Sequence, residues 1–577
     1  MVFVPPSWVP KLPFDPPDSI PIGEFMSNEA YGRYPISKSR NPFTCGITGK
    51  TYSTTEAFQR RECIAKALSK IMGWTPNEGT PWEKVIGVFS FNNIDYLTVL
   101  HAIHRLSGIA TPANVAYSTA ELEHQLKTSG AKALFTCAAV LKDALKAAKA
   151  SGIPEDKVFI LDIPGFENPK GFKTVDDLVE LGRGSPELEP LVWSQGQGAR
   201  QVAFLCYSSG TSGLPKAVMI SHRNVIANTM QYRLYESVAR KKFGVETQVE
   251  LGLLPFSHIY GLQVIAHGGT WRGDEVIVLP KFELTQHLQA IEKFKINNLI
   301  VVPPIVVRML SSKEECKKYD LSSVRALYTG AAPTGKETVE EMLKWFPKWH
   351  ICQGYGMTET STVVVSTSEH DILQGTSGSL LPGCRAKVVG LDGKEITGYD
   401  QPGELLIQSP SVTLGYLNNA QATTESYIYD NDGRWMKTGD EVIVTKSPLG
   451  NEHFAVVDRL KELIKVKGHQ VAPAELEAHL LAHDAVDDCA VISVHDDRDG
   501  EAPKAFVVKA PSRAGQKDEG VAAEIIKHVQ DHKAKYKWLK GGVEFIDAIP
   551  KSPSGKILRR LLRDKEREAR RAKGAKL

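Results

Sequence analysis

Residues 207–216 read Y-S-S-G-T-S-G-L-P-K, and this stretch decides how the rest of the chain is interpreted. It follows a short apolar run, 202–206, that is typical of a buried strand. An uninterrupted block of Ser, Thr and Gly can turn backbone N–H groups and hydroxyls inward around an anion, and Gly permits the close approach that this needs. Lys216 adds a mobile positive charge. The stretch therefore predicts a phosphate-binding loop made of Ser208, Ser209, Gly210, Thr211, Ser212, Gly213 and Lys216.

This loop differs from the common nucleotide P-loop, which requires G-x-x-x-x-G-K followed by Ser or Thr. A nearer match at 330–336 fails because Glu337 stands at the position of that hydroxyl residue, so we interpret it as accidental. A flexible Ser/Gly linker is the alternative interpretation of 207–216. Further motifs downstream argue against it.

Length and composition describe an ordinary globular protein. The 577 residues suggest three to four domains or subdomains. A net charge of +3 indicates no special partner such as nucleic acid, and the eight Cys form no C-x-x-C pair that would suggest zinc or a disulfide scaffold. We expect no signal peptide and no membrane span, since the most apolar stretch, 299–310, is short and contains Pro303, Pro304 and Arg308.

The chain ends in Ala575-Lys576-Leu577, one residue away from the S-K-L peroxisomal address. A strongly basic segment precedes it, which would present the tripeptide in solvent. We expect an import receptor as a partner and a peroxisomal location, or a cytoplasmic one if the tripeptide is not read.

Strand-like and helix-like runs alternate along most of the chain. Strands are predicted at 85–90, 133–136, 158–161, 276–279, 298–302 and 326–328, with helices at 55–71, 96–106, 139–150 and 284–294. Such alternation predicts a mostly parallel sheet with crossover helices. Short strands separated by turns at 383–417 predict a barrel-like antiparallel subdomain, and the last part of the chain reads as a small α+β domain. Residues 1–50 are expected to form an extended arm.

Further motifs follow in order: L-P-F-S-H-I-Y-G at 254–261, Q-G-Y-G-M-T-E-T at 353–360, K-T-G-D at 437–440, D-R-L-K-E-L-I-K at 458–465 and P-K-S-P-S-G-K at 550–556. Together the chain resembles the adenylate-forming superfamily of acyl- and aryl-CoA ligases, luciferases and peptide adenylation domains. The resemblance covers about residues 45–565 and is strongest to 4-coumarate–CoA ligase-like enzymes. It implies an α/β fold with a large N-terminal domain, 1–457, and a small mobile C-terminal domain, 458–577.

The resemblance also implies the chemistry. Such enzymes join a carboxylic acid to ATP, with Mg²⁺, and pass the acyl group from the resulting acyl-adenylate to coenzyme A. Lys556 would bind the attacking carboxylate and the α-phosphate, and Glu359 would hold the metal. The remaining expected ATP or AMP contacts, besides the loop and Lys556, are Ala331, Gln353, Gly354, Tyr355, Thr358, Asp440, Arg459, Lys461 and Lys465. Lys461 would be the hinge of the small domain, and Lys281, Lys467 and Gly468 would contact CoA.

The acid pocket is the least constrained part. The resemblance implies that His258 gates or positions the substrate, beside Tyr260, Val264, Ala331 and Gly354. We interpret His101, His104 and the 495–499 segment as structural, not as metal ligands.

The sequence thus predicts an AMP-forming carboxylic acid–CoA ligase for an aryl or medium-chain acid, with Lys556, His258, Thr358 and Glu359 as its catalytic residues. The alternatives are an adenylating enzyme that passes its acyl group to a carrier protein or to oxygen, a kinase-like ATPase that releases ADP, and a degenerate nucleotide-binding module.

Overall fold

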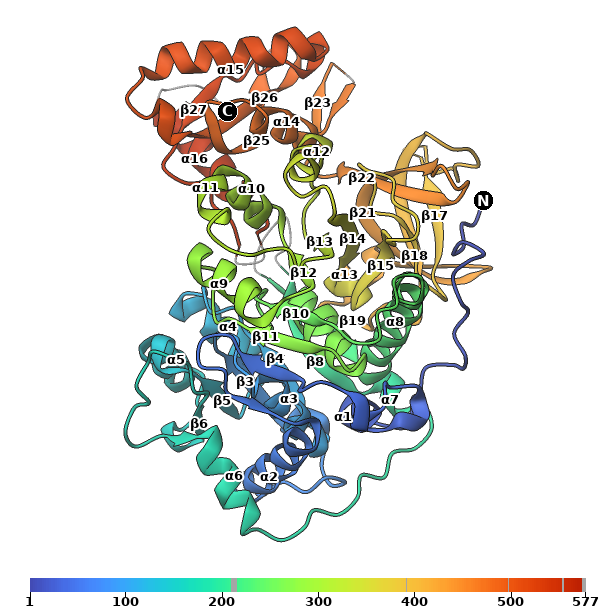
Figure 1. Ribbon diagram of the computed structural model, residues 1–577, viewed down its shortest axis with the longest axis vertical. Coiled ribbons are helices and arrows are strands. Elements are labelled where there is room, and N and C mark those ends of the chain that lie inside the picture. Colours follow the sequence, from blue (N-terminus) through green and yellow to red (C-terminus); the bar gives the residue numbers. More distant parts are fainter. Residues whose placement is uncertain (209–214, 391, 468, 497, 553–554, 573–577) are drawn as a thin grey trace.

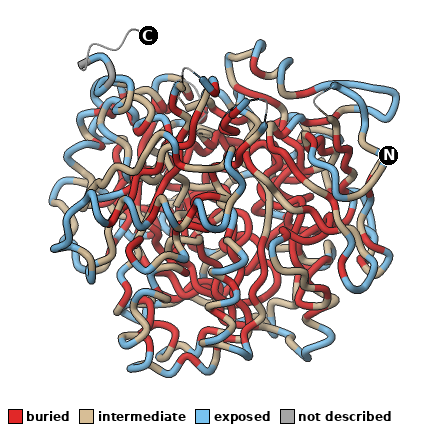
Figure 2. Tube along the Cα trace, turned by 90° about the horizontal axis from the view of Figure 1, so that it is seen from above, coloured by how far each residue is buried: buried red, intermediate tan, exposed pale blue. Residues whose placement is uncertain are grey.

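The computed structural model describes residues 1–577 except 209–214, 391, 468, 497, 553–554 and 573–577. The chain builds a large body from its first 459 residues and carries a smaller C-terminal domain at one end (Figure 1). Seen from above, buried positions fill the interior and exposed ones lie around it (Figure 2). The predicted α/β class is confirmed.

The first large sheet has eight strands, and its centre is parallel as the alternating sequence pattern predicts. Its β8 leads into the Ser/Gly loop, and β8 and β9 pair antiparallel on either side of that loop. In spatial order the strands are β19 (Gly415–Tyr416), β9 (Lys216–Ser221), β8 (Val202–Ser208), β4 (Ile109–Pro112), β3 (Val85–Phe89), β5 (Ala133–Thr136), β6 (Val158–Ile160) and β7 (Lys173–Thr174).

The second large sheet has nine strands, parallel in the middle and antiparallel at both edges. In order they are β16 (Ser379–Leu380), β15 (Thr362–Ser366), β14 (His350–Met357), β13 (Ala326–Thr329), β12 (Asn298–Val301), β10 (Val249–Gly252), β11 (Glu275–Val278), β1 (Phe43–Cys45) and β2 (Thr51–Tyr52). The carboxyl ends of parallel strands meet at one edge of a sheet, where ligands of open α/β folds bind.

Helices cover these sheets. They are α1 (Ile22–Ser27), α2 (Thr54–Met72), α3 (Tyr96–Arg105), α4 (Thr119–Ser129), α5 (Leu141–Ala150), α6 (Val175–Arg183), α7 (Gln197–Arg200), α8 (His222–Phe243), α9 (Leu284–Phe294), α10 (Pro303–Ser311), α11 (Lys313–Cys316) and α12 (Lys336–Trp345). A π-helical segment, Tyr260–Gly269, replaces the α-helix that its apolar sequence would allow. The helix predicted at 284–294 is confirmed as α9.

One prediction about the N-terminal region needs correction. Helix α2 begins as predicted, and its cap is Ser53, which forms a reciprocal capping box with Glu56. The expected extended arm contains α1, and its β1 pairs in parallel with β11 far along the chain. Phe3 is 2% exposed and pairs with Ala386, so the first residues are part of the core.

An antiparallel subdomain lies beside the second sheet, where the turn-rich sequence predicts one. It consists of β17 (Arg385–Val389), β18 (Pro402–Gln408), β20 (Tyr427–Asp430), β21 (Gly433–Lys446) and β22 (Glu452–Arg459), with α13 (Ala420–Ser426). The predicted domain limit at 457/458 falls inside β22. Strand β22, which ends at Arg459, belongs to the sheet of the antiparallel subdomain. The next strand begins at Ile464 and belongs to the sheet of the C-terminal domain.

The C-terminal domain has its own sheet and its own apolar core, as an independent domain requires. Its strands are β23 (Ile464–Val466), β24 (His469–Val471), β25 (Val486–Asp496), β26 (Gly500–Lys509) and β27 (Val543–Phe545). Its helices are α14 (Pro473–Leu481), α15 (Asp518–His532) and α16 (Arg559–Ala572). Among the described helices, none is both long and apolar enough to cross a membrane.

Candidate active site

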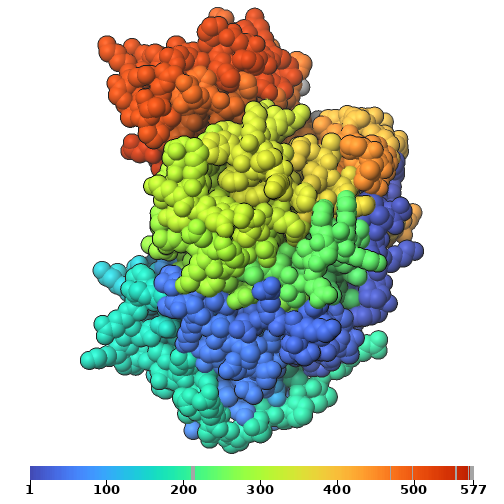
Figure 3. All heavy atoms as spheres, viewed as in Figure 1, coloured from blue at the N-terminus to red at the C-terminus, as the bar shows by residue number. Residues whose placement is uncertain are grey.

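A cleft of about 640 Å³ lies where the C-terminal domain meets the body. In the space-filling view the C-terminal domain projects beyond the body, with a visible recess beside their junction (Figure 3). Both parts line the cleft: α10, the segment before α12, and β14, β21 and β22 from the body, and α14 and the 555–559 segment from the other side. Seven predicted site residues line it, namely Ala331, Gln353, Gly354, Tyr355, Asp440, Arg459 and Lys556.

One wall of the cleft holds a buried carboxylate between a phenol and a guanidinium. The Tyr355 hydroxyl donates a 2.7 Å hydrogen bond to Oδ2 of Asp440, and Arg459 Nε lies 3.7 Å from the other carboxylate oxygen. Burial raises the pKa of Asp440, while Arg459 and the Tyr355 hydrogen bond oppose the rise. The carboxylate is thus held in place and points at the cleft, where it can accept hydroxyl donors.

Lys556 enters the cleft from the C-terminal side. The Ser552 N–H donates to the Lys556 carbonyl at 2.8 Å, and Gly555 lies in the left-handed region at φ +81°. Gly555 also lies against the start of α10, where an added Cβ would meet Val302 at 3.1 Å. Burial, and then the charge of Arg459, lower the pKa of Lys556 to about 8. A cation with a lowered pKa in a cleft is typical of a functional group.

Glu359 lies beside the Ser/Gly loop and is 6% exposed. Its Oε1 accepts hydrogen bonds from the hydroxyls of Ser208 at 3.2 Å and Tyr416 at 2.8 Å. The ammonium of Lys216 lies 5.0 Å from the centre of the Tyr416 ring. One carboxylate with hydroxyl neighbours fits the oxygen ligands that Mg²⁺ prefers, if phosphate oxygens and waters complete the site. Thr358, next in sequence, is buried in the same short helical turn.

The other side of the cleft is largely apolar. Pro303, Pro304 and Val307 of α10 line it. The predicted pocket residue Tyr260 does not line the cleft; its ring lies beside the backbone of Gly330, the chain neighbour of Ala331, where an added Cβ would be 3.1 Å away. Ala331 has a left-handed backbone, φ +68°, which residues with a Cβ seldom adopt away from functional sites.

His258 lies at the start of the π-helical segment. Burial lowers its pKa to about 4, with the charge of Lys556 adding to the effect. His258 is therefore a neutral imidazole near the Lys556 cation. Val264 is buried inside the π-helical segment and does not line the cleft.

Four of the predicted lysines lie elsewhere in this arrangement. The side chains of Lys281, Lys461, Lys465 and Lys467 are exposed and line no part of the cleft. Lys467 pairs instead with Asp499 at 2.8 Å. Ser209, Gly210, Thr211, Ser212, Gly213, Gly468 and the Ala575-Lys576-Leu577 tail lie outside the described residues. Their predicted roles remain predictions.

Two arginines at the cleft have no counterpart among the predicted site residues. Arg308 lines the apolar wall with an exposed side chain, although its orientation could not be predicted from sequence. Arg559 is 9% exposed and donates to Glu462 at 2.7 Å and to both carboxylate oxygens of Glu477. The sequence predicted Arg559 to lie in a solvated basic tail, because its partners Glu462 and Glu477 are distant in the chain and give no local signal.

The histidine pair at 101 and 104 occupies core positions. His101 Nε2 lies 3.1 Å from Nε2 of His267, and His104 Nε2 lies 3.0 Å from the carbonyl of Ala203. Burial lowers the pKa of both imidazoles. Neither belongs to a group of potential metal ligands among the described residues. This agrees with their interpretation as structural.

Comparison with known proteins gives the family of the chain. Residues 38–417 match the profile of the family described as AMP-binding enzyme, and residues 475–556 match that of its C-terminal domain. The acyl-CoA ligase AFT1-1 of Alternaria alternata is 42% identical over 98% of this chain and 97% of its own length. The acyl-CoA ligase easD of Emericella nidulans is 39% identical over 98% of this chain and its own full length.

Solved structures share the fold. An anthranilate CoA ligase bound to anthranoyl-AMP superposes with a TM-score of 0.77 at 22% identity, covering 95% of this chain and 98% of its own. ATP-bound MatB from Rhodopseudomonas palustris has a TM-score of 0.74 at 24% identity, covering 95% and 99%. The matched profiles span both parts that line the cleft, and the fungal relatives match nearly end to end. The chain therefore belongs to the AMP-binding enzyme family, within the adenylate-forming superfamily and among homologues that are acyl-CoA ligases.

Proposed function

We propose that this AMP-forming acyl-CoA ligase activates an apolar carboxylic acid, aryl or medium-chain, and transfers it to coenzyme A. The observation that carries the proposal is the convergence of Lys556 with the Tyr355–Asp440–Arg459 wall on one cleft. These residues come from opposite sides of the domain junction. A nucleotide and a carboxylate can therefore meet there.

The first half-reaction would join the acid to the α-phosphorus of ATP. A carboxylate oxygen forms a bond to that phosphorus, and the bond to the pyrophosphate oxygen breaks. Such a transfer depends on positioning and charge neutralisation more than on covalent help. Asp440 would accept the ribose hydroxyls, and Lys556 would neutralise the oxygens of the carboxylate and the α-phosphate. Mg²⁺, when bound near Glu359, would neutralise phosphate charge.

The second half-reaction would form the thioester. The thiolate of CoA attacks the acyl carbon, and AMP leaves with the electron pair of the carbon–oxygen bond. The predicted CoA contacts Lys281 and Lys467 are exposed and lie outside the cleft in this arrangement. A rotation of the C-terminal domain about the Lys461 region would bring another face of that domain to the cleft. Hinge motions of this kind depend on a few residues at the end of an element.

The apolar acid follows from the lining. Pro303, Pro304 and Val307 of the cleft wall suit a flat or unbranched hydrocarbon group. The neutral imidazole of His258 is suited to hydrogen-bond the substrate without adding charge. Transfer to a carrier protein or to oxygen remains the alternative after adenylation.

A product assay tests this function. The enzyme is incubated with ATP, Mg²⁺ and cinnamic, phenylacetic, benzoic, octanoic or palmitic acid, with and without CoA. Release of AMP and pyrophosphate together with an acyl-CoA is expected for an aryl or medium-chain acid. Adenylate without thioester would favour the carrier or oxygen alternative, and ADP would contradict an adenylating function.

Peroxisomal import is a separate proposal that rests on Ala575-Lys576-Leu577 alone. A fluorescent protein fused before residue 1 should enter peroxisomes, and deletion of the three residues should leave it in the cytoplasm. Diffuse fluorescence of the intact fusion would contradict the proposal.

A further inference from the structure

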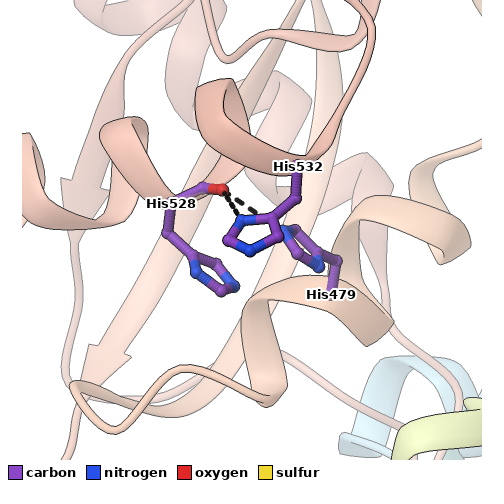
Figure 4. A group of neighbouring side chains, drawn as sticks. All are labelled: His479, His528 and His532. Carbon is purple, nitrogen blue, oxygen red and sulfur yellow. Dashed lines mark hydrogen bonds between the residues drawn. The ribbon is translucent and has the colours of Figure 1, made fainter.

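Three histidines gather on adjacent helices of the C-terminal domain, next to the cleft but without lining it. His479 lies on α14, and His528 and His532 lie one turn apart on α15 (Figure 4). Residues four apart share one face of a helix. Among the described residues, this is the one group of three His, Cys or carboxylate side chains whose candidate ligand atoms all lie within 4.8 Å of one another.

We propose that His479, His528 and His532 form a binding site for a divalent transition metal of the Zn²⁺ type. Three imidazoles are a common ligand set for Zn²⁺, with Zn–N distances of about 2.0–2.1 Å and a fourth position for water. In a tetrahedron of that size the ligand nitrogens are roughly 3.3 Å apart. The present separations reach up to 4.8 Å, so the side chains would turn toward one another on binding the ion.

The hydrogen bonds of the cluster leave ring nitrogens available. His532 Nδ1 lies 2.8 Å and His479 Nε2 3.4 Å from the backbone carbonyl of His528, as the dashed lines in Figure 4 show. The Nε2 atom of His528 is buried and has no hydrogen-bond partner within the described part of the chain. A buried polar atom without a partner calls for an explanation, and a bound ion supplies one. A carbonyl that accepts from a ligating imidazole is also the usual way of orienting it.

The cluster is suited to a metal electrostatically. Burial lowers the pKa of both His479 and His528, and this direction favours the uncharged form of the ring that binds metal. The charged neighbours are of both signs: Lys533 lowers and Glu337 of α12 raises the pKa of His479. Lys533 is itself paired with Glu475 at 3.1 Å.

Three ligands, not four, fit the geometry. The His483 ring is 5.0 Å from that of His528, but its Nδ1 accepts a hydrogen bond from the backbone of Ala485. His532 is exposed, so the fourth position of the ion would face solvent. All three ligands belong to one domain, so the site would persist when that domain moves. Because it would join α14 to α15, a bound ion would stabilise the C-terminal domain by mass action.

Metal titration of the full-length protein tests the site. Co²⁺ serves as the spectroscopic probe, since its visible absorption reports tetrahedral coordination, and Zn²⁺ competes for the same site. We expect one Co²⁺ per chain, displaced by Zn²⁺, and a Zn²⁺-dependent rise in melting temperature. H528Q and H532A should each weaken Zn²⁺ binding by about 100-fold, at least as much as the loss of an outer-sphere partner costs.

His469→Ala is the matched control, because His469 is an exposed histidine of the same domain that stacks on Tyr536. It should bind Zn²⁺ as the wild type does. His532 is exposed, so the melting temperature of H532A without metal should equal that of the wild type. Loss of metal binding in this variant would then not be due to misfolding. Absence of Co²⁺ binding by the wild type, or binding unchanged in both H528Q and H532A, would overturn the proposal.

Discussion

Tyr355 and Asp440 join two sheets across one wall of the cleft. Tyr355 lies in the part of β14 that pairs antiparallel with β15, and Asp440 lies in β21 of the antiparallel subdomain, yet the phenol donates to the carboxylate at 2.7 Å. Asp440 is thereby fixed by a residue of the neighbouring sheet, with Arg459 at its other oxygen. The geometry of the proposed nucleotide site therefore depends on how the two sheets pack.

Asp440→Asn should weaken ATP binding strongly. The amide keeps the size of the carboxylate but loses the charge that strengthens a hydrogen bond to a ribose hydroxyl. Such bonds contribute about 1.5–3 kcal/mol, so the KM for ATP should rise about 10- to 100-fold while the KM for the acid changes little. Pyrophosphate exchange measures the first KM at varied ATP and the second at varied acid. The companion variant Y355F should give a smaller rise, and an unchanged KM in D440N would remove Asp440 from the nucleotide site.

The adenylation rate should fall with pH above about 8. The pKa of Lys556 is lowered to about 8 by burial and by Arg459, so the ammonium is present below that pH and is lost above it. Because the charged form neutralises the developing transition state, kcat/KM should decline about tenfold per pH unit well above the pKa. The pH profile of pyrophosphate exchange measures the decline.

The variant K556A provides the control for that profile. It should lose about 10²- to 10³-fold in adenylation rate, the usual effect of removing one stabilising donor, and it should lose the alkaline decline as well. A profile in K556A that still falls at the wild-type pH would assign the titration to another group.

Sequence patterns predicted the elements whose signals are local. Residues 284–294 have helical apolar spacing, and they form α9 with those bounds. The three-residue strand β1 could not be predicted, because its partner β11 lies more than two hundred residues along the chain and Phe43–Cys45 carries no period of its own. The π-helical turn at Tyr260 escaped prediction for a similar reason, since its apolar sequence suits an α-helix equally well.

Residues of the candidate site could be named from the sequence where they belong to a recognisable motif. Asp440, Arg459 and Lys556 come from three separate motifs and meet at one cleft. The role of Arg559 depended on a contact with Glu477, which lies in another element of the C-terminal domain. The sequence of a basic tail does not indicate which arginine is buried, because burial and ion pairing depend on contacts with distant parts of the chain.

Arg559→Met should destabilise the C-terminal domain. The substitution leaves Glu462 and Glu477 buried without their guanidinium, and breaking a buried pair in this way costs about 3–5 kcal/mol. Urea unfolding followed by circular dichroism should therefore show an earlier transition. Arg567→Met is the matched control, because the Arg567 side chain is 65% exposed, and its unfolding free energy should change by less than about 0.5 kcal/mol. Equal stability of the two variants would show that the Glu462–Arg559–Glu477 network is dispensable.

Lys461→Pro should separate the two half-reactions. Lys461 lies in the turn between β22 and β23, its φ is not positive, and its N–H donates to no described residue, so proline there removes no hydrogen bond of the described structure. Proline fixes φ and would oppose the rotation that the second half-reaction requires. Adenylation, followed by pyrophosphate exchange, should stay within about twofold of wild type, while transfer of preformed acyl-adenylate to CoA should fall at least about tenfold. Lys461→Ala removes the same side chain without restricting the backbone and should retain both rates. Equal loss of both rates in the proline variant would indicate a damaged cleft, and loss of neither would show that thioester formation needs no change of backbone conformation at residue 461.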